Sequence, residues 1–413
     1  MSSNDLTGKR TGERIQILRE RRGLSRPVLA GLVGMSASWL KGIEQGRRLP
    51  PRLPVLVKLA EALAVGDVTA LVGTDMEIGA SQSLPVASFA RIPLDAVPAI
   101  RDAVRDPLLA PSTNPVAVES LTGRVVDAWT LWHSSPNHRA DVGRILPALL
   151  TDARNAARAA GPDQRVANAL LADVYALVQH VTVWASEPEL AWTVADRAMT
   201  AAQAADTPAA LAGAAWTLGM THRSVGDVDG SLALADDAFA LLTPELDRGG
   251  DDTAGMAGSL LLHASLTCAR AGREGDAWRY WDQASTIAER LPAGYYHPWT
   301  MFGTANVALH AVSINADLSK SSAARSQAEL IDPSQIPSRE RRGRLGVEIA
   351  RSYHQRRDYV ATIHWLEFAY QTAADSVHYS PMARQITADA LEHGGALISE
   401  RARRLAESVG LPL

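Results

Sequence analysis

Three segments in the second half of the chain share one order of small, bulky and turn residues. They read LGMTHRSVGDVDGS at 218–231, ASLTCARAGREGDA at 264–277 and IARSYHQRRDYVAT at 349–362. Their turn residues, Gly226, Gly272 and Arg357, lie 46 and 85 residues apart, and weaker copies are indicated near Asn315 and Ser186. A unit of this length cannot bury its own apolar face, so we expect helical hairpins that stack into a solenoid.

The rest of the second part of the chain is also typical of helices. Over residues 96–413, long segments rich in Ala and Leu alternate with turns that contain Pro, Gly or Asp, and no segment has the alternating pattern of a strand. With 413 residues, of which 46% are hydrophobic, the chain can bury a sizeable core in two or more domains. The expected fold class is all-α.

Composition argues against a membrane or secreted protein. Long apolar segments such as NALLADVYALVQHVTVWAS are interrupted by polar residues and fall short of the roughly 18 apolar residues of a membrane span. The N-terminus lacks the apolar region and cleavage site of a secretion signal. Cys268 is the single cysteine, which excludes an internal disulfide. We therefore expect a protein of the reducing cytoplasm.

Charge is distributed unevenly between the first 60 residues and the remainder. Lys9 to Lys58 contain twelve Lys or Arg and three Glu, a local charge of +9, so the remainder carries −13 to give the net charge of −4. A basic head on an acidic body is typical of a domain that binds a polyanion, joined to a part with another task.

The basic head has the pattern of several short helices. Apolar residues recur at helical spacing and are interrupted by Gly23, Gly34, Gly46 and Gly66. The periodicity is lost over 75–95, where Gly, Ser and Pro gather as in a linker. We therefore expect a small helical domain at 8–74, a linker at 75–95 and a helical body at 96–413.

The segment RIQILRERRGLSRPVLAGLVGMSASWLKGIEQGRRLP contains the signals of two consecutive capped helices. Ser25 is placed to cap one helix, with Pro27 in its first turn, and Ser36 is placed to cap the next. Gly34 between them suits a left-handed turn. This segment resembles the helix-turn-helix of the phage repressors, the Cro/cI-like or XRE family. The resemblance implies that the helix after Ser36 enters the major groove of DNA.

The resemblance also implies roles for particular residues. In this family the arginine at the Arg19 position pairs with the glutamate at the Glu44 position inside the fold. Arg26, Gln45, Arg47 and Arg48 would contact phosphates, and the exposed residues of the helix after Ser36 would contact bases, with specificity from Lys41, thymine methyl groups or DNA shape. Trp39 either packs on the DNA backbone or seals the core. The expected DNA contacts are Arg26, Ala37, Ser38, Trp39, Lys41, Gly42, Gln45, Arg47 and Arg48.

The first of the three repeated segments resembles a tetratricopeptide repeat. It has a Leu218-Gly219 pair, a turn at Gly226-Asp227 and small residues at Ser231 and Ala238, although the other copies are degenerate and longer than the usual 34 or so residues. A repressor-like head on such a solenoid is similar in layout to the bacterial Rgg/PlcR-type regulators. That similarity implies a homodimer that senses a peptide or small molecule, as in quorum sensing, and binds a DNA operator.

The solenoid pattern yields candidate ligand contacts. In a tetratricopeptide-like hairpin, the first helix faces inward at positions ten, six and three residues before the turn. Rings, guanidinium groups and an amide in one groove would suit a peptide or a small amphipathic signal. Alternatively, Trp216 fills the core between repeats and the polar residues are solvated. The positions counted from the turns at Gly226, Arg357 and Asn315 or Ala316 are Trp216, Met220, Arg223, Val347, Arg351, His354, Asn306 and His310.

The sequence contains no catalytic or metal-binding signature. His-Glu-x-x-His, paired cysteines, Gly-x-Ser-x-Gly and a glycine-rich dinucleotide loop are all missing. EHGG at 392–395 is better interpreted as a helix break, and YYHPW at 295–299 as core packing. We expect no enzyme activity, cofactor or metal. A second hypothesis stays open, in which the solenoid is a protein-protein scaffold with a tethering or degenerate head.

Overall fold

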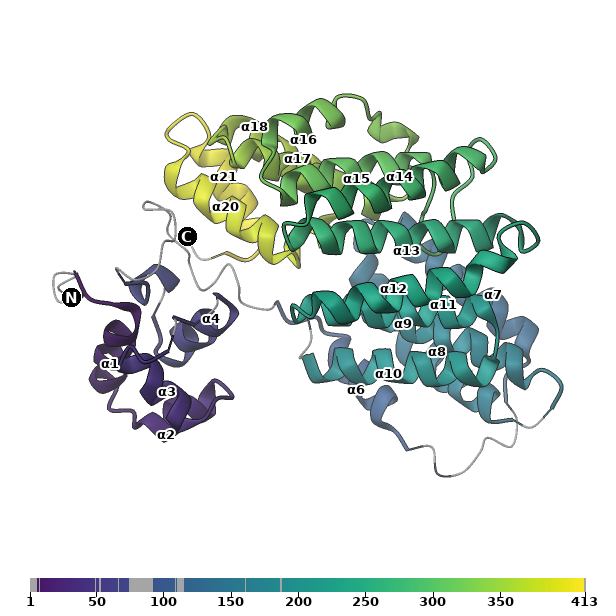
Figure 1. Cartoon of the computed structure of the whole chain (residues 1–413), viewed down its shortest axis with the longest axis horizontal. Helices are drawn as coiled ribbons and strands as arrows, with labels where there is room; N and C mark the ends of the chain where they lie inside the picture. The colour runs from purple at the N-terminus through teal and green to yellow at the C-terminus, as the bar shows by residue number, and fades with distance from the viewer. Residues whose placement is uncertain are drawn as a thin grey trace. The chain divides into compact units, whose positions relative to one another are not determined.

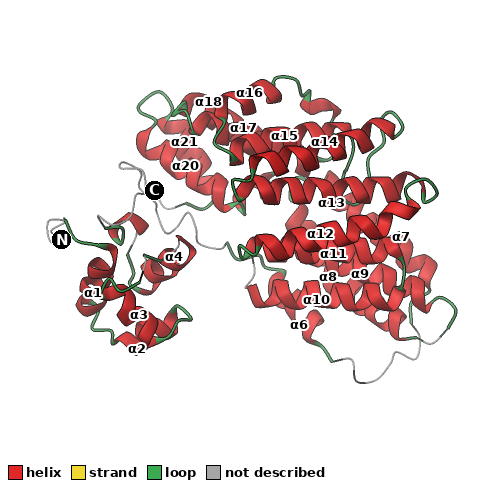
Figure 2. Ribbon diagram, in the orientation of Figure 1, coloured by secondary structure: helices red, strands yellow, loops and turns green. Residues whose placement is uncertain are grey.

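The structure, a computed structural model of the whole chain, is helical throughout its described part, with no β-strand (Figure 2). It describes residues 6, 8–48, 50–51, 53–65, 67–73, 92–107, 109, 115–159, 161–185 and 188–411. The predicted all-α class is confirmed. Contacts group Met1–Ala90 with Pro381–Leu413 in one compact unit and Arg91–Ser380 in a second unit. Most of the predicted linker at 75–95, and the weak repeat turn near Ser186, lie outside the described residues.

The N-terminal helices of the first unit pack around one small core. The core includes Ile15, Leu29, Leu40 and Ile43, all buried, whereas Leu32 of the same periodic pattern is 62% exposed. Burying one face of each short helix is what holds so small a domain together. These helices are α1 Thr11–Arg21, α2 Arg26–Leu32, α3 Ala37–Glu44 and α4 Leu53–Ala62, followed by the 3₁₀ helix η2 Val68–Ala70.

The start of each central helix in the head is fixed by its cap. The Ser25 hydroxyl accepts a hydrogen bond from the Val28 N–H at 3.5 Å, and the Ser36 hydroxyl accepts one from the Trp39 N–H at 3.0 Å. Gly34 has a φ of +73°, which is the left-handed conformation expected for the turn. The predicted caps and turn are confirmed.

The C-terminal segment of the first unit is a pair of helices, α20 Pro381–His393 and α21 Ser399–Ser408. The chain breaks between them where predicted, with Gly395 at a φ of +71°. Arg384 is fully buried and donates a hydrogen bond to the Val409 carbonyl just beyond the end of α21. A guanidinium at a helix C-terminus satisfies carbonyls that lack a partner within the helix.

The second unit is an array of antiparallel helical hairpins (Figure 1). From α7 to α19, each helix packs against the next, and each odd-numbered helix also packs against the next odd-numbered one. The odd-numbered helices therefore form one layer, and the even-numbered helices cover it. The helices are α6 Val97–Arg105, α7 Val118–Ser134, α8 His138–Arg158, α9 Gln164–Thr182, α10 Pro188–Ala205, α11 Pro208–Ser224, α12 Val228–Leu242, α13 Gly250–Arg270, α14 Glu274–Arg290, α15 Thr304–Asp317, α16 Ser321–Ala328, α17 Arg339–His354, α18 Tyr359–Thr372 and α19 Ala374–His378.

Four hairpins turn in the same way. Each turn contains a residue with positive φ, namely Gly226, Gly272, Ser319 and Arg357, and the next N–H bonds a carbonyl five residues back at 2.8–3.1 Å. This is the Schellman arrangement of helix C-termini. The predicted turn at Asn315 or Ala316 is wrong, because α15 continues to Asp317. The Asn315 side chain donates to the Ala311 carbonyl within the helix, and the turn falls at Ser319.

The hairpin array closes on itself. Helix α17 contacts α7, and α19 contacts α8. His133 near the end of α7 forms a hydrogen bond with the Ser338 hydroxyl at 3.0 Å, at the start of α17. The Asp375 carboxylate of α19 accepts the Arg139 N–H at 2.7 Å, at the start of α8. The odd-numbered layer therefore surrounds a central space, where the sequence had suggested an open concave groove.

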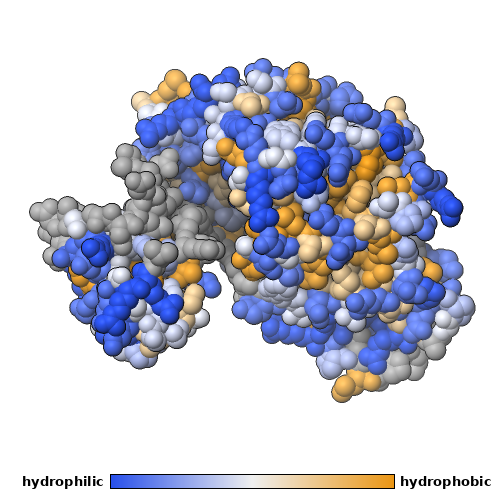
Figure 3. Space-filling view, viewed as in Figure 1, coloured by the Kyte–Doolittle hydropathy of each residue, from blue (hydrophilic) through white to orange (hydrophobic). Residues whose placement is uncertain are grey.

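The surface drawn in Figure 3 is mainly hydrophilic. Apolar side chains interrupt it over the middle of the hairpin array, in the area that α12 and α13 occupy in Figure 1. Within the ranges given above, no helix combines the length and apolar character needed to cross a bilayer.

Candidate functional site

Helix α3 divides into a buried face and an outer face, as the sequence predicted. Leu40 and Ile43 are buried in the head core, whereas Ser38 and Lys41 are exposed. Ala37 and Gly42 are partly covered. Trp39 is half-buried and packs against the head core, so the core-sealing role is the one that the structure contains.

The turn after α3 carries the predicted phosphate-contacting residues. The N–H groups of Arg47 and Arg48 bond the Gly42 carbonyl at 2.8 and 3.2 Å. A Cβ atom at Gly42 would lie 3.0 Å from Cδ of Arg48, so the arginine stem lies over this glycine. Gln45, Arg47 and Arg48 are all exposed. The lack of a side chain at Gly42 thus leaves room for the Arg48 stem, and the arginine covers this glycine.

Glu44 places a buried carboxylate at the end of α3 between two arginines. Arg19 reaches it with Nε at 2.6 Å from Oε1 and Nη2 at 3.1 Å from Oε2, so the predicted pair is present. Arg26 contributes a second ion pair, with its Nε 2.5 Å from Oε2. The hydrogen bond to Glu44, above all, raises the pKa of Arg19 despite burial. One carboxylate thus ties α1, α2 and α3 together.

The ion pair of Arg26 was not foreseen. The sequence predicted Arg26 as a phosphate contact only, whereas the structure shows it oriented by Glu44, with its side chain 35% exposed. The Arg26 guanidinium therefore pairs with Glu44 on one side, and its exposed side is free to contact a DNA phosphate. A guanidinium held by one carboxylate is preorganised to offer its remaining donors to another oxyanion.

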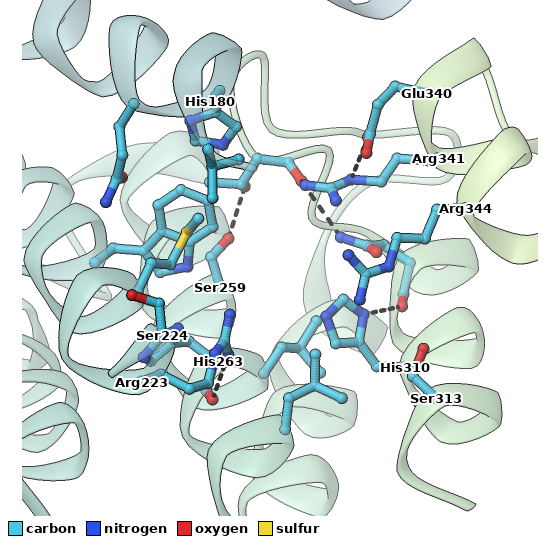
Figure 4. A pocket seen from close by; sticks show the side chains of 18 of the residues that line it. His180, Arg223, Ser224, Ser259, His263, His310, Ser313, Glu340, Arg341 and Arg344 are labelled. Carbon is cyan, nitrogen blue, oxygen red and sulfur yellow. Dashed lines mark hydrogen bonds and ion pairs between the residues drawn. The ribbon is translucent and has the colours of Figure 1, made fainter. Parts of the chain in front are cut away.

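A second candidate site is the pocket inside the closed hairpin array, a hollow of about 180 Å³ (Figure 4). Its walls come from the C-terminal ends of α7 and α9, the starts of α8, α10 and α17, the later parts of α11 and α13, and much of α15. Five of the eight positions counted from the turns line it, together with residues that the sequence did not single out. Those five are Trp216, Met220, Arg223, Asn306 and His310.

Arg351 and His354 do not line this pocket. Arg351 is paired with Asp317 at 2.5 Å and with Glu348 at 3.5 Å, and the His354 ring lies beside Tyr359. Val347, counted from the same turn, is buried in the body instead. Counting a fixed number of residues back from the turn fails on α17, because the pocket does not lie at the same level along each odd-numbered helix. It contacts the end of α11 but the beginning of α17.

One wall of the pocket is aromatic. The His180 ring stacks on Trp216 with their centroids 5.3 Å apart and meets Trp132 edge-on at 5.6 Å. Trp216 also contacts Trp299 edge-on at 5.8 Å and belongs to the hydrophobic core of the body. Trp216 therefore does both: it packs in the hydrophobic core, which was the alternative prediction, and it lines the pocket.

The α17 side of the pocket is basic. Arg341 and Arg344 come from it, and Arg139, Arg223 and Arg270 line the pocket from other helices, against the single carboxylate of Glu340. The guanidinium of Arg341 lies 3.5 Å from Glu340, and that of Arg344 lies 3.3 Å from Glu348. Burial would raise the pKa of Glu340, but the charges of Arg341, His138 and Arg344 outweigh it and hold that pKa at about 2. Figure 4 shows Arg341 and Arg344 facing the hollow from the α17 side.

The pocket histidines are kept neutral. Burial lowers the pKa of His180 to about 4 and that of His310 to about 3, and it places the pKa of His263 below its usual range. Nδ1 of His310 lies 2.7 Å from the Asn306 carbonyl and therefore donates to it. The net formal charge of the lining at neutral pH is thus set by arginines.

Several buried polar atoms around the hollow have no hydrogen-bond partner within the described residues. They are Gln179 Oε1, His263 Nδ1, Asn306 Oδ1 and Ser313 Oγ. All four residues line the pocket. Leaving a buried polar group unsatisfied costs about 1–3 kcal/mol, so a polar ligand that meets these atoms would bind favourably.

The sequence did hold a signal for the basic wall. The segment RERRGR at 339–344 places four arginines in the first turns of a helix, where the helix dipole disfavours positive charge. Because these arginines do not stabilise the helix, their position at its start indicates a binding role. No group of three or more His, Cys, Asp or Glu in the described ranges could hold a metal ion.

Residues 10–71 match the family described as a helix-turn-helix domain. That range begins just before α1 and ends just after η2, so it covers the whole described head. No curated protein matches the chain. The chain therefore carries an N-terminal helix-turn-helix domain, which indicates a DNA-binding regulator, joined to an all-helical remainder of packed hairpins.

Proposed function

We propose that this protein is a signal-responsive transcriptional regulator of the bacterial cytoplasm. The helix-turn-helix head binds an operator, and a small molecule in the pocket of the hairpin array changes the DNA affinity. The observation that carries this proposal is the pairing of two built sites in one chain. One is a head that exposes Lys41 on α3 and Arg47 and Arg48 in the next turn, and the other is a pocket with unsatisfied buried polar atoms.

The arrangement of the pocket supports a sensor over a scaffold. Tetratricopeptide-like scaffolds bind extended partner segments along an open concave surface. Here α17 returns to α7, and the polar atoms lie around a bounded pocket that is partly open to solvent. A bounded pocket of about 180 Å³ suits a small ligand better than an extended protein segment.

The pocket chemistry supports binding over catalysis. His263 is within 2.8 Å of the Ser231 hydroxyl, but Ser231 is fully buried and also donates to the Gly219 carbonyl. His180 and His310 each bond a main-chain carbonyl within their own helix. These hydrogen bonds hold the three histidines in the pocket wall. None of the three is placed as a base beside an exposed nucleophile, which is the pair that acyl transfer requires. We accordingly propose no enzyme activity.

Dimerisation through the body belongs to the same proposal. A helix-turn-helix head of this size reads few bases, so two heads on half-sites about one helical turn apart give useful affinity and specificity. We expect the full chain to be a homodimer at micromolar concentration in analytical ultracentrifugation. A monomer bound to an asymmetric single site would contradict this part of the proposal.

The decisive experiment measures DNA binding with and without small molecules. Fluorescence anisotropy would follow the full chain on labelled fragments from beside its own gene, in the presence and absence of a protein-free small-molecule extract of the native cells. We expect salt-dependent binding to one fragment and a shift of at least about tenfold in Kd with the extract. Sequence-independent binding that the extract leaves unchanged would contradict the proposal. Co-purification of a stoichiometric protein partner, without binding to any one DNA fragment, would favour the scaffold hypothesis.

A further inference from the structure

The arginines of the pocket differ in how their charges are compensated. Arg270 lies 3.4 Å from Asp317, and Arg344 and Arg341 each have a glutamate within 3.5 Å. Arg223 makes no ion pair within the described part of the chain, and its one hydrogen bond is a long one, 3.4 Å to the His263 carbonyl. A partly buried guanidinium without a carboxylate is costly unless something else supplies the negative charge.

Three arginines line the pocket from two of its helices. Arg223 comes from α11, and Arg341 and Arg344 come from α17, with His310 of α15 in the same lining. Figure 4 shows Arg223 on one side of the hollow and Arg341 and Arg344 on the other. Forked donors from two walls that face one space suit a single oxyanion.

The other part of the pocket is mainly aromatic. Trp216 and Met220 of α11 line it, together with His180 of α9 and Trp184 just beyond that helix. The guanidinium of Arg139 lies over the Trp184 ring, 5.2 Å from its centroid, and donates a hydrogen bond to the His180 carbonyl. The stacked His180 and Trp216 rings form a rigid wall with little polar surface. A flat apolar group packs well against such a wall and gains aromatic contacts in addition to its buried area.

We propose that the signal molecule is a small amphipathic anion, with a carboxylate or phosphate held by Arg223, Arg341 and Arg344 and a flat apolar group against Trp216 and Met220. This inference rests on the proposed function and specifies its ligand class. Asn306 and Ser313, which line the same pocket and have unsatisfied oxygens, offer further polar contacts to hydroxyl or amide groups of the ligand.

The test uses three probes of one shape that differ in charge. They are 2-naphthoate, 2-naphthyl phosphate and the neutral amide 2-naphthamide, each titrated into the full chain by isothermal calorimetry. We expect one of the two anions to bind one site per chain at least about tenfold more tightly than the amide. Which anion binds more tightly distinguishes a carboxylate from a phosphate ligand.

Variants assign the effect to the pocket. Arg223→Met keeps the apolar stem and removes the charge, and we expect it to weaken anion binding about tenfold while leaving amide binding unchanged. Arg223→Lys should retain part of the preference for the anions over the amide. Arg290→Met, at an exposed position at the end of α14, is the matched control and should change nothing. Because the removed charge is unpaired, Arg223→Met should keep its helix content and melting temperature, and Arg344→Met gives an independent second reading.

The outcomes separate the ligand class from the proposed function. Equal binding of anion and amide, binding that Arg223→Met and Arg344→Met leave unchanged, or no binding of any probe at about 1 mM would overturn the anion inference. Extract-dependent DNA binding could still stand in those cases. Arginine-dependent anion binding together with DNA affinity that no extract changes would support the ligand class and contradict the signalling role.

Discussion

Nε of Arg26 lies 2.5 Å from Oε2 of Glu44, which joins the first residue of α2 to the last residue of α3. Because Arg19 of α1 binds the same carboxylate, the relative orientation of three helices depends on one buried side chain. The position of α3 determines which side chains can reach DNA bases. The fold and the DNA-reading geometry of the head are therefore linked at Glu44.

Replacing Glu44 with Gln should destabilise the head by about 3–5 kcal/mol. The change leaves two guanidinium groups facing a neutral amide, and breaking one side of a buried ion pair has a cost in this range. Hydrogen exchange measured by mass spectrometry should show faster exchange in α1, α2 and α3 and unchanged exchange in the hairpin array. Glu61→Gln, at an exposed site on α4, is the control. Equal protection in both variants would show that the buried carboxylate is not the link.

Gly12→Ala should destabilise the same domain for a steric reason. A Cβ atom at Gly12 would lie 2.0 Å from the Ile43 carbonyl oxygen, so α1 and α3 would have to move apart. We expect a loss of about 3 kcal/mol or more. Gly31→Ala is the matched control, because a Cβ atom there meets nothing within 4 Å, and it should stabilise α2 by about 0.5–1 kcal/mol. Thermal unfolding of both variants checks the pair, and a similar loss in each would refute the close approach of α1 to α3.

The features that the sequence predicted well are local. Ser25 and Ser36 bond N–H groups three residues ahead, and Gly34 adopts a conformation of its own backbone. Such interactions depend only on neighbouring residues. The pair of Glu44 with Arg19, 25 residues away, came from the family resemblance. The second partner, Arg26, was missed because no local pattern marks it and its contact depends on how α2 and α3 cross.

The features that the sequence missed in the body depend on curvature. A repeat specifies how one hairpin packs on the next, and the left-handed turns at Gly226 and Gly272 follow from that pattern. Nothing in a local repeat fixes how many units bring α17 back to α7, where His133 meets Ser338 across 205 residues of sequence. Two of the five arginines that line the pocket are brought there by that closure, which explains why Arg341 and Arg344 were not among the predicted contacts.

Lys41 and Arg48 should affect DNA binding in different ways. Arg48→Ala removes an expected phosphate contact, so binding should weaken equally on all sequences, and the slope of log K against log salt should flatten by about one. Lys41→Ala removes the exposed cation on α3 and should reduce the preference for the operator over a scrambled duplex. Anisotropy titrations at several salt concentrations measure both effects, with Lys58→Ala on α4 as the control. A salt slope that Arg48→Ala leaves unchanged would contradict the proposed docking of the head.

The hairpin array should lose stability as the pH falls from 7 to 4. Burial lowers the pKa of His133, His180 and His297 to about 4 in the folded chain. In the unfolded chain these rings take up protons near pH 6.5, whereas the folded chain resists protonation until about pH 4. Between these values the unfolded state binds more protons, so each ring reduces the free energy of unfolding by up to about 1.4 kcal/mol per pH unit. Above pH 6.5 the rings are neutral in both states and this stability is fully present.

Two carboxyl groups act in the opposite direction. Burial raises the pKa of Asp173 to about 7 and also raises the pKa of Asp375, so both residues favour the folded state as the pH falls. These two aspartates offset only part of the effect of the histidines, and the net slope keeps its sign. Urea unfolding followed by circular dichroism at pH 7, 6 and 5 measures it. His180→Phe keeps a ring against Trp216 without a titrating group, so its stability should depend less steeply on pH, while His364→Asn, at an exposed site on α18, should follow the parent chain. Stability that is constant or rises over this pH range would show that these rings are not held neutral in the folded chain.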